Sequence, residues 1–184
     1  MVDVAARTLL TYVDYAALPD DGRRYELHAG ELSVTPAPGT HHQRVSLNLA
    51  ALLHAHVRAQ GLGEVLEAPT DCILSDHTVL QPDILFVDRE RRSIITERAV
   101  EGAPTLVVEI LSRSTARVDL GRKRALYAEH GVSWYWIVDP DAREIEALRL
   151  VSRSWEPAGR LTGSASVSLP PLPDLALDPA AIWG

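Results

Sequence analysis

A single glutamate interrupts a strongly apolar segment of this 184-residue chain. Glu109 lies within PTLVVEIL, residues 104–111, and has apolar neighbours on both sides. A strand this apolar is normally buried on both faces of its sheet. An ionised carboxylate there is costly unless it is paired, hydrogen-bonded or bound to a metal ion. Glu109 therefore needs a partner.

Asp83, in LQPDILFVD (residues 80–88), is the best candidate to share that site. If the two strands pair antiparallel with Asp83 opposite Glu109, their connection centres near residue 96, within the polar segment 89–102. Both acids then project from the odd-numbered face of their strands. Two neighbouring carboxylates repel, which raises one pKa or recruits a cation. Hard oxygen ligands favour Mg²⁺ or Mn²⁺ over zinc.

Lys123 is the only lysine among 18 basic residues, and all the others are arginine. An ammonium has a tunable pKa, whereas the arginine fork stays charged. A lone lysine in an arginine-rich chain could mark a position where arginine cannot work, or it could have survived by chance. On a helix that begins at Asp119, Leu120 and Tyr127 share a face with Lys123. This spacing directs Lys123 along a partly apolar face toward the sheet.

Each of these residues also has a plainer interpretation. A lone glutamate in a strand is often an ion-paired core residue, and Asp83 after a proline suits the start of a strand. Lys123 and Asp119 suit a surface ion pair one helical turn apart. Taken together, two acids and a lysine favour a chemical site over three unrelated structural residues.

The elements that must position these side chains follow an α/β (α+β) order. A hairpin at 24–28 and 31–35 precedes a helix capped by Thr40, which runs to residue 60 and ends at Gly61. The predicted apolar stripe of this helix is Val45, Leu49, Leu52, Leu53 and Val57. The sequence further predicts strands at 63–75, 80–87, 105–111, 132–138 and 144–150, and a second helix from Asp119 to about residue 130.

Two further segments are predicted to lack a central strand or a helix, and the N-terminal segment is predicted to be capped. Residues 152–163 suit a polar connection, and the prolines of the tail, from 166 onward, exclude a central strand or a helix. The segment 8–20 suits a short helix capped by Thr8 or Asp14. The whole predicts helices layered around one mixed sheet, with an N-terminal β-hairpin.

Composition bounds the function classes. The length predicts one domain, residues 1–184, with its core at about 40–150. We expect no membrane segment, no secretory signal and a cytoplasmic location, and the single cysteine excludes an intrachain disulfide framework. The net charge of −7 is unlike that of proteins that coat phosphates. An acidic protein that handles DNA needs a local basic groove or a metal ion.

Three runs resemble a known family: QPDILFVD, GAPTLVVEILSRST and DLGRKRALYAEHGVSWYWIVDP. They are similar to the Uma-two family of restriction endonucleases, a bacterial branch of the PD-(D/E)XK nuclease superfamily. YELHAGEL and the His42-containing start of the first long helix also fit. The resemblance covers roughly residues 8–183 and is most specific at 102–140. It implies a restriction-endonuclease-like fold, a mixed β-sheet flanked by helices.

The resemblance also implies Mg²⁺-dependent (or Mn²⁺-dependent) hydrolysis of DNA phosphodiester bonds. The two metal-binding acids match Asp83 and Glu109, and the backbone carbonyl of Ile110 is the expected third ligand. The family lysine usually lies two residues after the second acid, where this chain has Leu111. Lys123 would replace it from the following helix, to orient the attacking water or stabilise the growing negative charge.

Other residues are weaker candidates. Glu26 and His42 could line the edge of the site, or be a hairpin surface residue and a first-turn histidine. A basic patch for DNA, or simply solvated charges, could come from Arg113, Arg117, Arg122 and Arg124.

Three functions stay open at this point. The first is a DNA endonuclease, homodimeric by analogy with the family. The second is a catalytically inactive module of the same fold that binds DNA or a protein partner. The third is a purely structural ion-pair cluster of Asp83, Lys123 and Glu109.

Overall fold

A computed structural model describes residues 8–112, 114 and 116–184. In these residues the strands form three sheets, and the largest is a mixed sheet ordered β11-β10-β9-β8-β6-β3. Within it, β8 and β9 are parallel and the other neighbours are antiparallel. Its strands are β3 (Gly63–Glu67), β6 (Ile84–Asp88), β8 (Leu106–Ile110), β9 (Trp134–Asp139), β10 (Glu144–Val151) and β11 (Ser154–Leu161).

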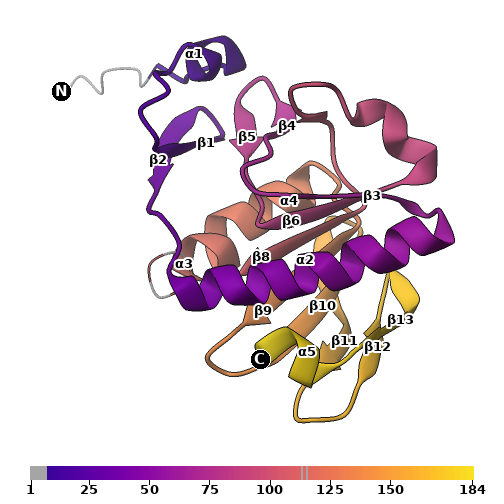
Figure 1. The fold of residues 1–184 in the computed structure, drawn as a ribbon. Helices are drawn as coiled ribbons and strands as arrows, with labels where there is room; N and C mark the ends of the chain where they lie inside the picture. Colours follow the sequence, from indigo (N-terminus) through magenta and orange to yellow (C-terminus); the bar gives the residue numbers. More distant parts are fainter. Residues whose placement is uncertain (1–7, 113, 115) are drawn as a thin grey trace.

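Helix α2 (Thr40–Gln60) covers one face of this sheet, as Figure 1 shows. Val45, Leu49, Leu53 and Val57 are buried against even-numbered residues of the central strands, while Leu52 is only partly buried. The predicted bounds are confirmed, and Gly61 ends the helix in the left-handed conformation. The predicted cap is wrong, because Gly39 is the N-cap and supplies no side-chain hydrogen bond.

Helix α4 (Arg124–Glu129) packs on the opposite face of the sheet. Its Leu126 and Tyr127 lie against odd-numbered strand residues such as Val107 and Tyr135. Glu109 is odd-numbered as well, so its side chain projects toward α4 and the helical turns before it. The even-numbered face of β8 therefore packs only into the apolar core. The odd-numbered face packs against α4 and also carries Glu109.

A second sheet, ordered β2-β1-β5-β4-β7, holds the predicted N-terminal hairpin. Figure 1 shows it beside the large sheet, with helix α1 (Tyr12–Ala16) over its end. Thr11 caps α1 in a capping box, so neither predicted cap, Thr8 nor Asp14, is the N-cap residue. The strands are β1 (Arg24–His28), β2 (Glu31–Thr35), β4 (Cys72–Ser75), β5 (Thr78–Leu80) and β7 (Val100–Glu101).

The prediction of one sheet is therefore corrected. Segment 63–75 divides into β3 and β4, one in each sheet. Segment 80–87 begins with Leu80, the last residue of β5 in the second sheet, and continues into β6 of the large sheet. Pro69 and Pro82 lie at the two breaks, and proline lacks the N–H that a continuing ladder needs. The second break leaves Gln81, Pro82 and Asp83 outside any strand, at the junction of the sheets.

The C-terminal part is more regular than predicted. Segment 152–163 contains edge strand β11, whose alternation is hidden because most of its side chains are exposed. The tail forms a hairpin of β12 (Val167–Leu169) and β13 (Leu172–Leu177) and the short helix α5 (Pro179–Trp183). The prolines do exclude a central strand, but Pro179 occupies the first turn of α5, where a missing N–H costs nothing.

None of the helices in the described ranges is long and apolar enough to cross a membrane.

Candidate active site

The two predicted acids lie opposite each other at the end of the β6–β8 pair. Strands β6 and β8 pair antiparallel with Ile84 opposite Val108, and one more step in this register sets Asp83 opposite Glu109. The predicted register is confirmed. Residues opposite each other in such a pair have Cα atoms about 5 Å apart. Both residues are buried, with relative exposures of 8% and 2%, and both line one pocket.

Asp83 is held through one of its carboxylate oxygens. Oδ2 accepts a hydrogen bond from the backbone N–H of Ile110 over 2.8 Å, and His42 Nε2 lies 3.1 Å from the same oxygen. His42 comes from the first turn of α2, and its Nδ1 is buried without a hydrogen-bond partner among the described residues. Oδ1 of Asp83 makes no hydrogen bond to any of the described residues. That second oxygen is available to a ligand in the pocket.

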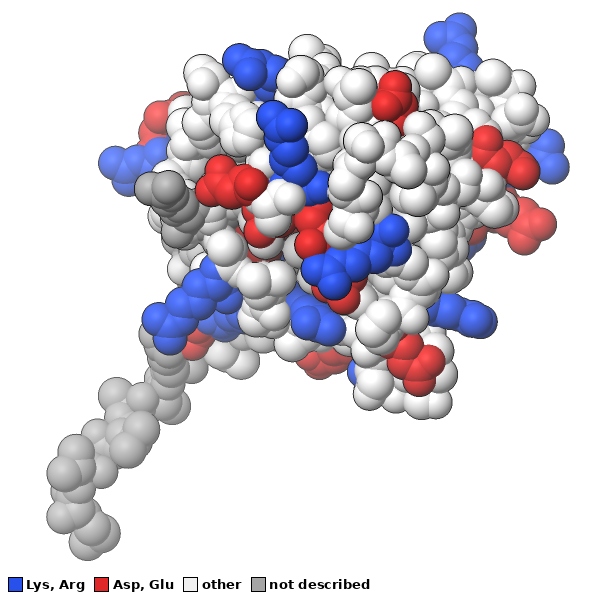
Figure 2. Space-filling model, turned by 90° about the horizontal axis from the view of Figure 1, so that it is seen from below, with Lys and Arg blue, Asp and Glu red and all other residues white. Residues whose placement is uncertain are grey.

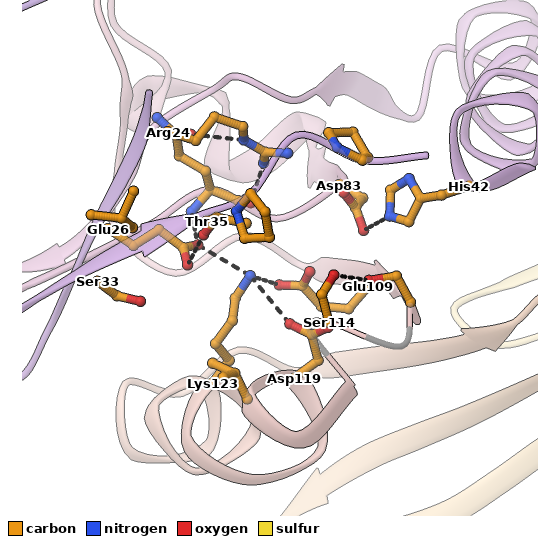
Figure 3. A pocket seen from close by; sticks show the side chains of 16 residues that line it. Arg24, Glu26, Ser33, Thr35, His42, Asp83, Glu109, Ser114, Asp119 and Lys123 are labelled. Carbon is orange, nitrogen blue, oxygen red and sulfur yellow. Dashed lines mark hydrogen bonds and ion pairs between the residues drawn. The ribbon is translucent and has the colours of Figure 1, made fainter. Parts of the chain in front are cut away.

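Glu109 is held in the same one-sided way. Its Oε1 lies 2.6 Å from Lys123 Nζ and accepts a 2.6 Å hydrogen bond from the Tyr127 hydroxyl. Its Oε2 makes no hydrogen bond to any residue that the structure describes. Figure 3 shows the carboxylates of Asp83 and Glu109 on the same side of the pocket, with Lys123 reaching Glu109 from below.

Lys123 lies among three carboxylates. Its Nζ is 2.6 Å from Glu109 Oε1, 3.1 Å from Glu26 Oε1 and 3.7 Å from Asp119 Oδ1. The ammonium does not pair with Asp83, so the predicted cluster of Asp83, Lys123 and Glu109 is corrected. The surface pair with Asp119 is also wrong, because Lys123 and Asp119 are both buried.

The turn that presents Lys123 is a π-helix, η2 (Asp119–Lys123), between α3 (Ala116–Val118) and α4. The helix starts before Asp119, so Asp119 is not its cap. The wider turn changes which residues share a face: Leu120 is 43% exposed, while Asp119 and Lys123 are both buried. The expectation that Leu120 lies beside Lys123 therefore fails. Single π turns occur often at functional sites.

Burial and charge shift the pKa values of the site residues. Burial lowers the pKa of Lys123, but Glu109, Glu26 and Asp119 outweigh it and hold that pKa well above its usual range. Burial raises the pKa of Glu109 well above its usual range, opposed by Lys123 and reinforced by Asp119 and Asp83. Glu26 and Asp119 also face the Lys123 ammonium, so Glu109 is not its only negative partner.

Glu26 belongs inside the site and is not a hairpin surface residue. It is 3% exposed, and its Oε1 accepts a 2.7 Å hydrogen bond from the backbone N–H of Gln81 and contacts Lys123. Its Oε2 lies 3.1 Å from His28 Nε2. Burial raises the pKa of Glu26, but Lys123 and these hydrogen bonds outweigh it and lower the pKa to about 2. The hairpin thus delivers a permanent negative charge to the pocket.

The donor set fits a hard divalent cation that keeps part of its water shell. Asp83 and Glu109 each turn one unpaired oxygen to the pocket, and carboxylate oxygens are the ligands that Mg²⁺ prefers. Among the described residues no three His, Cys, Asp or Glu side chains are grouped as a metal site. Mg²⁺ is commonly bound by one or two carboxylates and retains several waters.

The predicted basic patch has a mixed outcome. Arg113 lies outside the described residues. Arg117 is exposed, Arg124 is half-buried, and Arg122 is committed to Glu31 and to the backbone carbonyl of His28. Figure 2 shows one face of the molecule, with acidic atoms recessed near its centre and basic side chains on either side of them.

Sequence reasoning missed Tyr127 as a contact of Glu109, Asp119 as a buried partner of Lys123, and Arg24 as a lining residue of the pocket. The signal for Tyr127 was present, since it lies four residues after Lys123. The position of Asp119 depends on the π turn, which an α-helical spacing cannot reveal. Arg24 precedes Tyr25 and Glu26 in the hairpin and carried no distinguishing pattern.

The structure is a mixed α+β fold with helices on both faces of its large sheet, and two buried acids lie near a buried lysine. The model of the Uma2 family, described as "Putative restriction endonuclease", matches residues 12–180. The chain belongs to this family.

A solved structure has a similar fold. It is the crystal structure of a protein from Anabaena variabilis, described as a "putative nuclease belonging to DUF820". The TM-score is 0.76 at 20% sequence identity, and the match covers 95% of this chain and 97% of the other. No curated protein matches this sequence.

Proposed function

We propose that this protein is a metal-dependent DNA endonuclease whose site is built from Asp83, Glu109 and Lys123. The observation that carries the proposal is the opposed pair of buried carboxylates, each with one oxygen free toward the pocket, beside a lysine. The family to which the chain belongs supports the reaction class. The neighbour from Anabaena variabilis supports it only through the fold, because its identity to this chain is low.

The proposed ligands for Mg²⁺ or Mn²⁺ are the two carboxylates and the backbone carbonyl of Ile110. The N–H of Ile110 points to Asp83. Because the N–H and C=O of one strand residue point to the same side, the Ile110 carbonyl also faces Asp83. A bound divalent ion would polarise a phosphate oxygen and lower the pKa of a water molecule. The chain supplies the rigid frame, since each carboxylate is fixed by its other oxygen.

Lys123 is proposed to stabilise the negative charge that develops on the phosphate, or to orient the attacking water. Glu26 and Asp119 hold its ammonium independently of Glu109. Lys123 can therefore stay in the pocket when Glu109 binds a cation through Oε2. Tyr127 donates to the same Glu109 oxygen as Lys123 and so restricts the rotation of that carboxylate.

The test is cleavage of supercoiled plasmid, single-stranded circular DNA and branched oligonucleotides in Mg²⁺, Mn²⁺ or EDTA. Asp83→Asn and Glu109→Gln preserve shape and remove charge, and each is expected to reduce cleavage by about a hundredfold or more. Asp174→Asn is the control, because Asp174 is an exposed aspartate of β13. Circular dichroism verifies that each variant is folded.

The inactive module is the alternative, and the same substrates distinguish it. Metal-dependent cleavage that both variants retain would overturn the site assignment. DNA binding without cleavage by the wild-type protein would favour the inactive module. The net charge of −7 and Leu111 at the usual lysine position are the features that favour this second function. The proposed homodimer rests on family analogy and is tested by the mass in light scattering.

A further inference from the structure

Arg24 lies where two cavities meet. One cavity is the pocket of Asp83, Glu109 and Lys123, and the other runs past the first turns of α2 toward Glu67 and Pro69. Both cavities are lined by four shared residues: Arg24, Pro38, His42 and Asp83. A chain that passed from one cavity to the other would therefore pass Arg24 and the first acid together.

The guanidinium of Arg24 forms hydrogen bonds to Gln81 rather than an ion pair with a described carboxylate. Its Nε donates to Gln81 Oε1 over 3.3 Å and its Nη2 donates to the Gln81 carbonyl over 3.1 Å. Among the described residues it forms no ion pair, although Glu26 and Asp83 line the same pocket. An arginine has five N–H donors, and these contacts use two of them. The charge and the remaining donors are available to a ligand.

Gln81, the partner of Arg24, is itself fixed on both its backbone and its side chain. The backbone N–H donates to Glu26 Oε1 over 2.7 Å, and Nε2 donates to Asp71 Oδ1 over 2.8 Å. Asp71 also accepts a 2.8 Å hydrogen bond from the Tyr15 hydroxyl. This network orients an otherwise flexible side chain at the pocket. A solvated surface arginine would need no such support.

We propose that Arg24 is a substrate-binding residue that contacts the non-bridging oxygens of the phosphate entering beside Asp83. The planar guanidinium fork matches the geometry of a phosphate group and binds it through two hydrogen bonds. In a protein with net charge −7 and four carboxylates around this pocket, an unneutralised cation offsets the repulsion between site and substrate. Figure 3 shows the Arg24 guanidinium on the Asp83 side of the pocket.

This inference rests on the proposed function, because it takes a nucleic acid strand as the ligand. The test compares Arg24→Gln with Arg23→Gln, which removes the same charge one residue earlier. Arg23 is 67% exposed at its side chain and pairs with Asp21, so it serves as a matched control. Binding of fluorescein-labelled single-stranded and duplex oligonucleotides is measured by anisotropy in EDTA from about 50 to 200 mM salt.

Arg24→Gln is expected to weaken binding roughly ten- to a hundredfold, the loss of a charge-assisted contact. The slope of log K against log salt should decrease in magnitude by about one, which corresponds to the loss of one phosphate contact. Arg23→Gln should leave both the affinity and this slope near the wild-type values. Arg24→Lys keeps the charge and should recover part of the affinity. Thermal melts check that the loss of the Gln81 contact does not unfold the protein.

Equal effects of the two glutamine variants would overturn the role of Arg24 and leave the proposed function intact. A wild-type protein that neither binds nor cleaves any of the substrates would overturn the proposed function, and the role of Arg24 with it. If Arg24→Gln fails to fold, Arg24→Lys becomes the deciding variant. This variant keeps the charge but lacks the planar guanidinium, so an affinity and a salt slope equal to those of the wild type would contradict bidentate binding.

Discussion

Asp83 Oδ2 accepts a hydrogen bond from the backbone N–H of Ile110, 2.8 Å away. This bond joins the residue that precedes β6 to the last residue of β8, so it closes the antiparallel pair with a side chain where the ladder ends. It also commits one oxygen of Asp83 to the protein and leaves Oδ1 for the pocket. The plainer interpretation of Asp83, as a residue that merely begins a strand after a proline, does not account for this bond to the neighbouring strand.

The first prediction concerns metal binding. Mn²⁺ or Mg²⁺ at a hundredfold excess over Kd should stabilise the wild-type protein by about 2.7 kcal/mol, which is a rise in Tm of about 5 °C or more for this size. Asp83→Asn keeps an acceptor for the Ile110 N–H but loses the charge, so its Tm should not respond to metal. Differential scanning calorimetry with and without metal measures both.

Asp174→Asn is the control for this melt, and it should respond to metal like the wild type. A metal-dependent shift that persists in Asp83→Asn would place the cation elsewhere. No shift in either protein would contradict a metal site formed without substrate.

Much of this site could be predicted from the sequence, because strand pairing has few solutions. The apolar runs around Asp83 and Glu109 indicate two strands, and the polar segment 89–102 is centred where an antiparallel pairing of these two residues requires it. The prediction that Lys123 points inward is likewise correct, although for a different reason than expected. The helical face that carries it is set by a π turn, not by α-helical spacing.

The remainder depends on contacts between segments far apart in the chain. Glu26 reaches Lys123 because the hairpin belongs to a second sheet that lies against the first, and no periodicity in residues 24–35 reveals that sheet. Strand β11 was missed for another reason. An edge strand with mostly polar, exposed side chains has no apolar alternation to detect.

The second prediction concerns the buried charge of Lys123. Lys123→Met should destabilise the protein at pH 7 by about 3 kcal/mol or more, because Glu26, Glu109 and Asp119 would stay buried without a cation. Urea denaturation by circular dichroism gives the free energy of unfolding. A loss below about 1 kcal/mol would mean that the three carboxylates do not depend on this ammonium.

The third prediction distinguishes two quantities: the stability that the intact ion pairs contribute, and the stability lost when only the cation is removed. Glu26→Gln and Glu109→Gln added to Lys123→Met remove two of the carboxylates along with the cation. The triple variant should regain at least half of the stability that Lys123→Met loses, because buried ion pairs are often no more stabilising than neutral packing. A triple variant less stable than Lys123→Met alone would contradict this view. Urea denaturation of all three proteins decides.

The fourth prediction concerns Tyr127, whose hydroxyl donates to Glu109 Oε1 over 2.6 Å. Tyr127→Phe removes a buried hydrogen bond to a carboxylate and should cost about 2 kcal/mol of unfolding free energy. Tyr135→Phe is a matched control, because the Tyr135 hydroxyl donates to the backbone carbonyl of Asp119 and the two rings are in contact. Its cost should be about 1 kcal/mol. Equal costs would show that the Glu109 bond has no special strength.

The last prediction is a pH dependence of stability from Glu26. Its pKa in the folded protein is lowered to about 2 from a usual value of 4.5, chiefly because Lys123 outweighs the effect of burial. A lowered pKa means that the unfolded chain binds the proton more tightly than the native protein. The contribution of Glu26 is therefore complete above about pH 4.5 and disappears as the pH falls toward 2. Its full size is roughly 3 kcal/mol.

Glu26→Gln should accordingly be less stable than wild type at pH 7, and the difference should shrink as the pH falls from about 4.5 toward 2. Urea denaturation at a series of pH values measures this difference. Glu101→Gln, at an exposed position of β7, should follow the wild-type curve throughout. If Glu26 is the charged partner of Lys123, its protonation at low pH must weaken this ion pair. A stability difference between Glu26→Gln and wild type that stays constant from pH 7 to pH 2.5 would therefore contradict this role of Glu26.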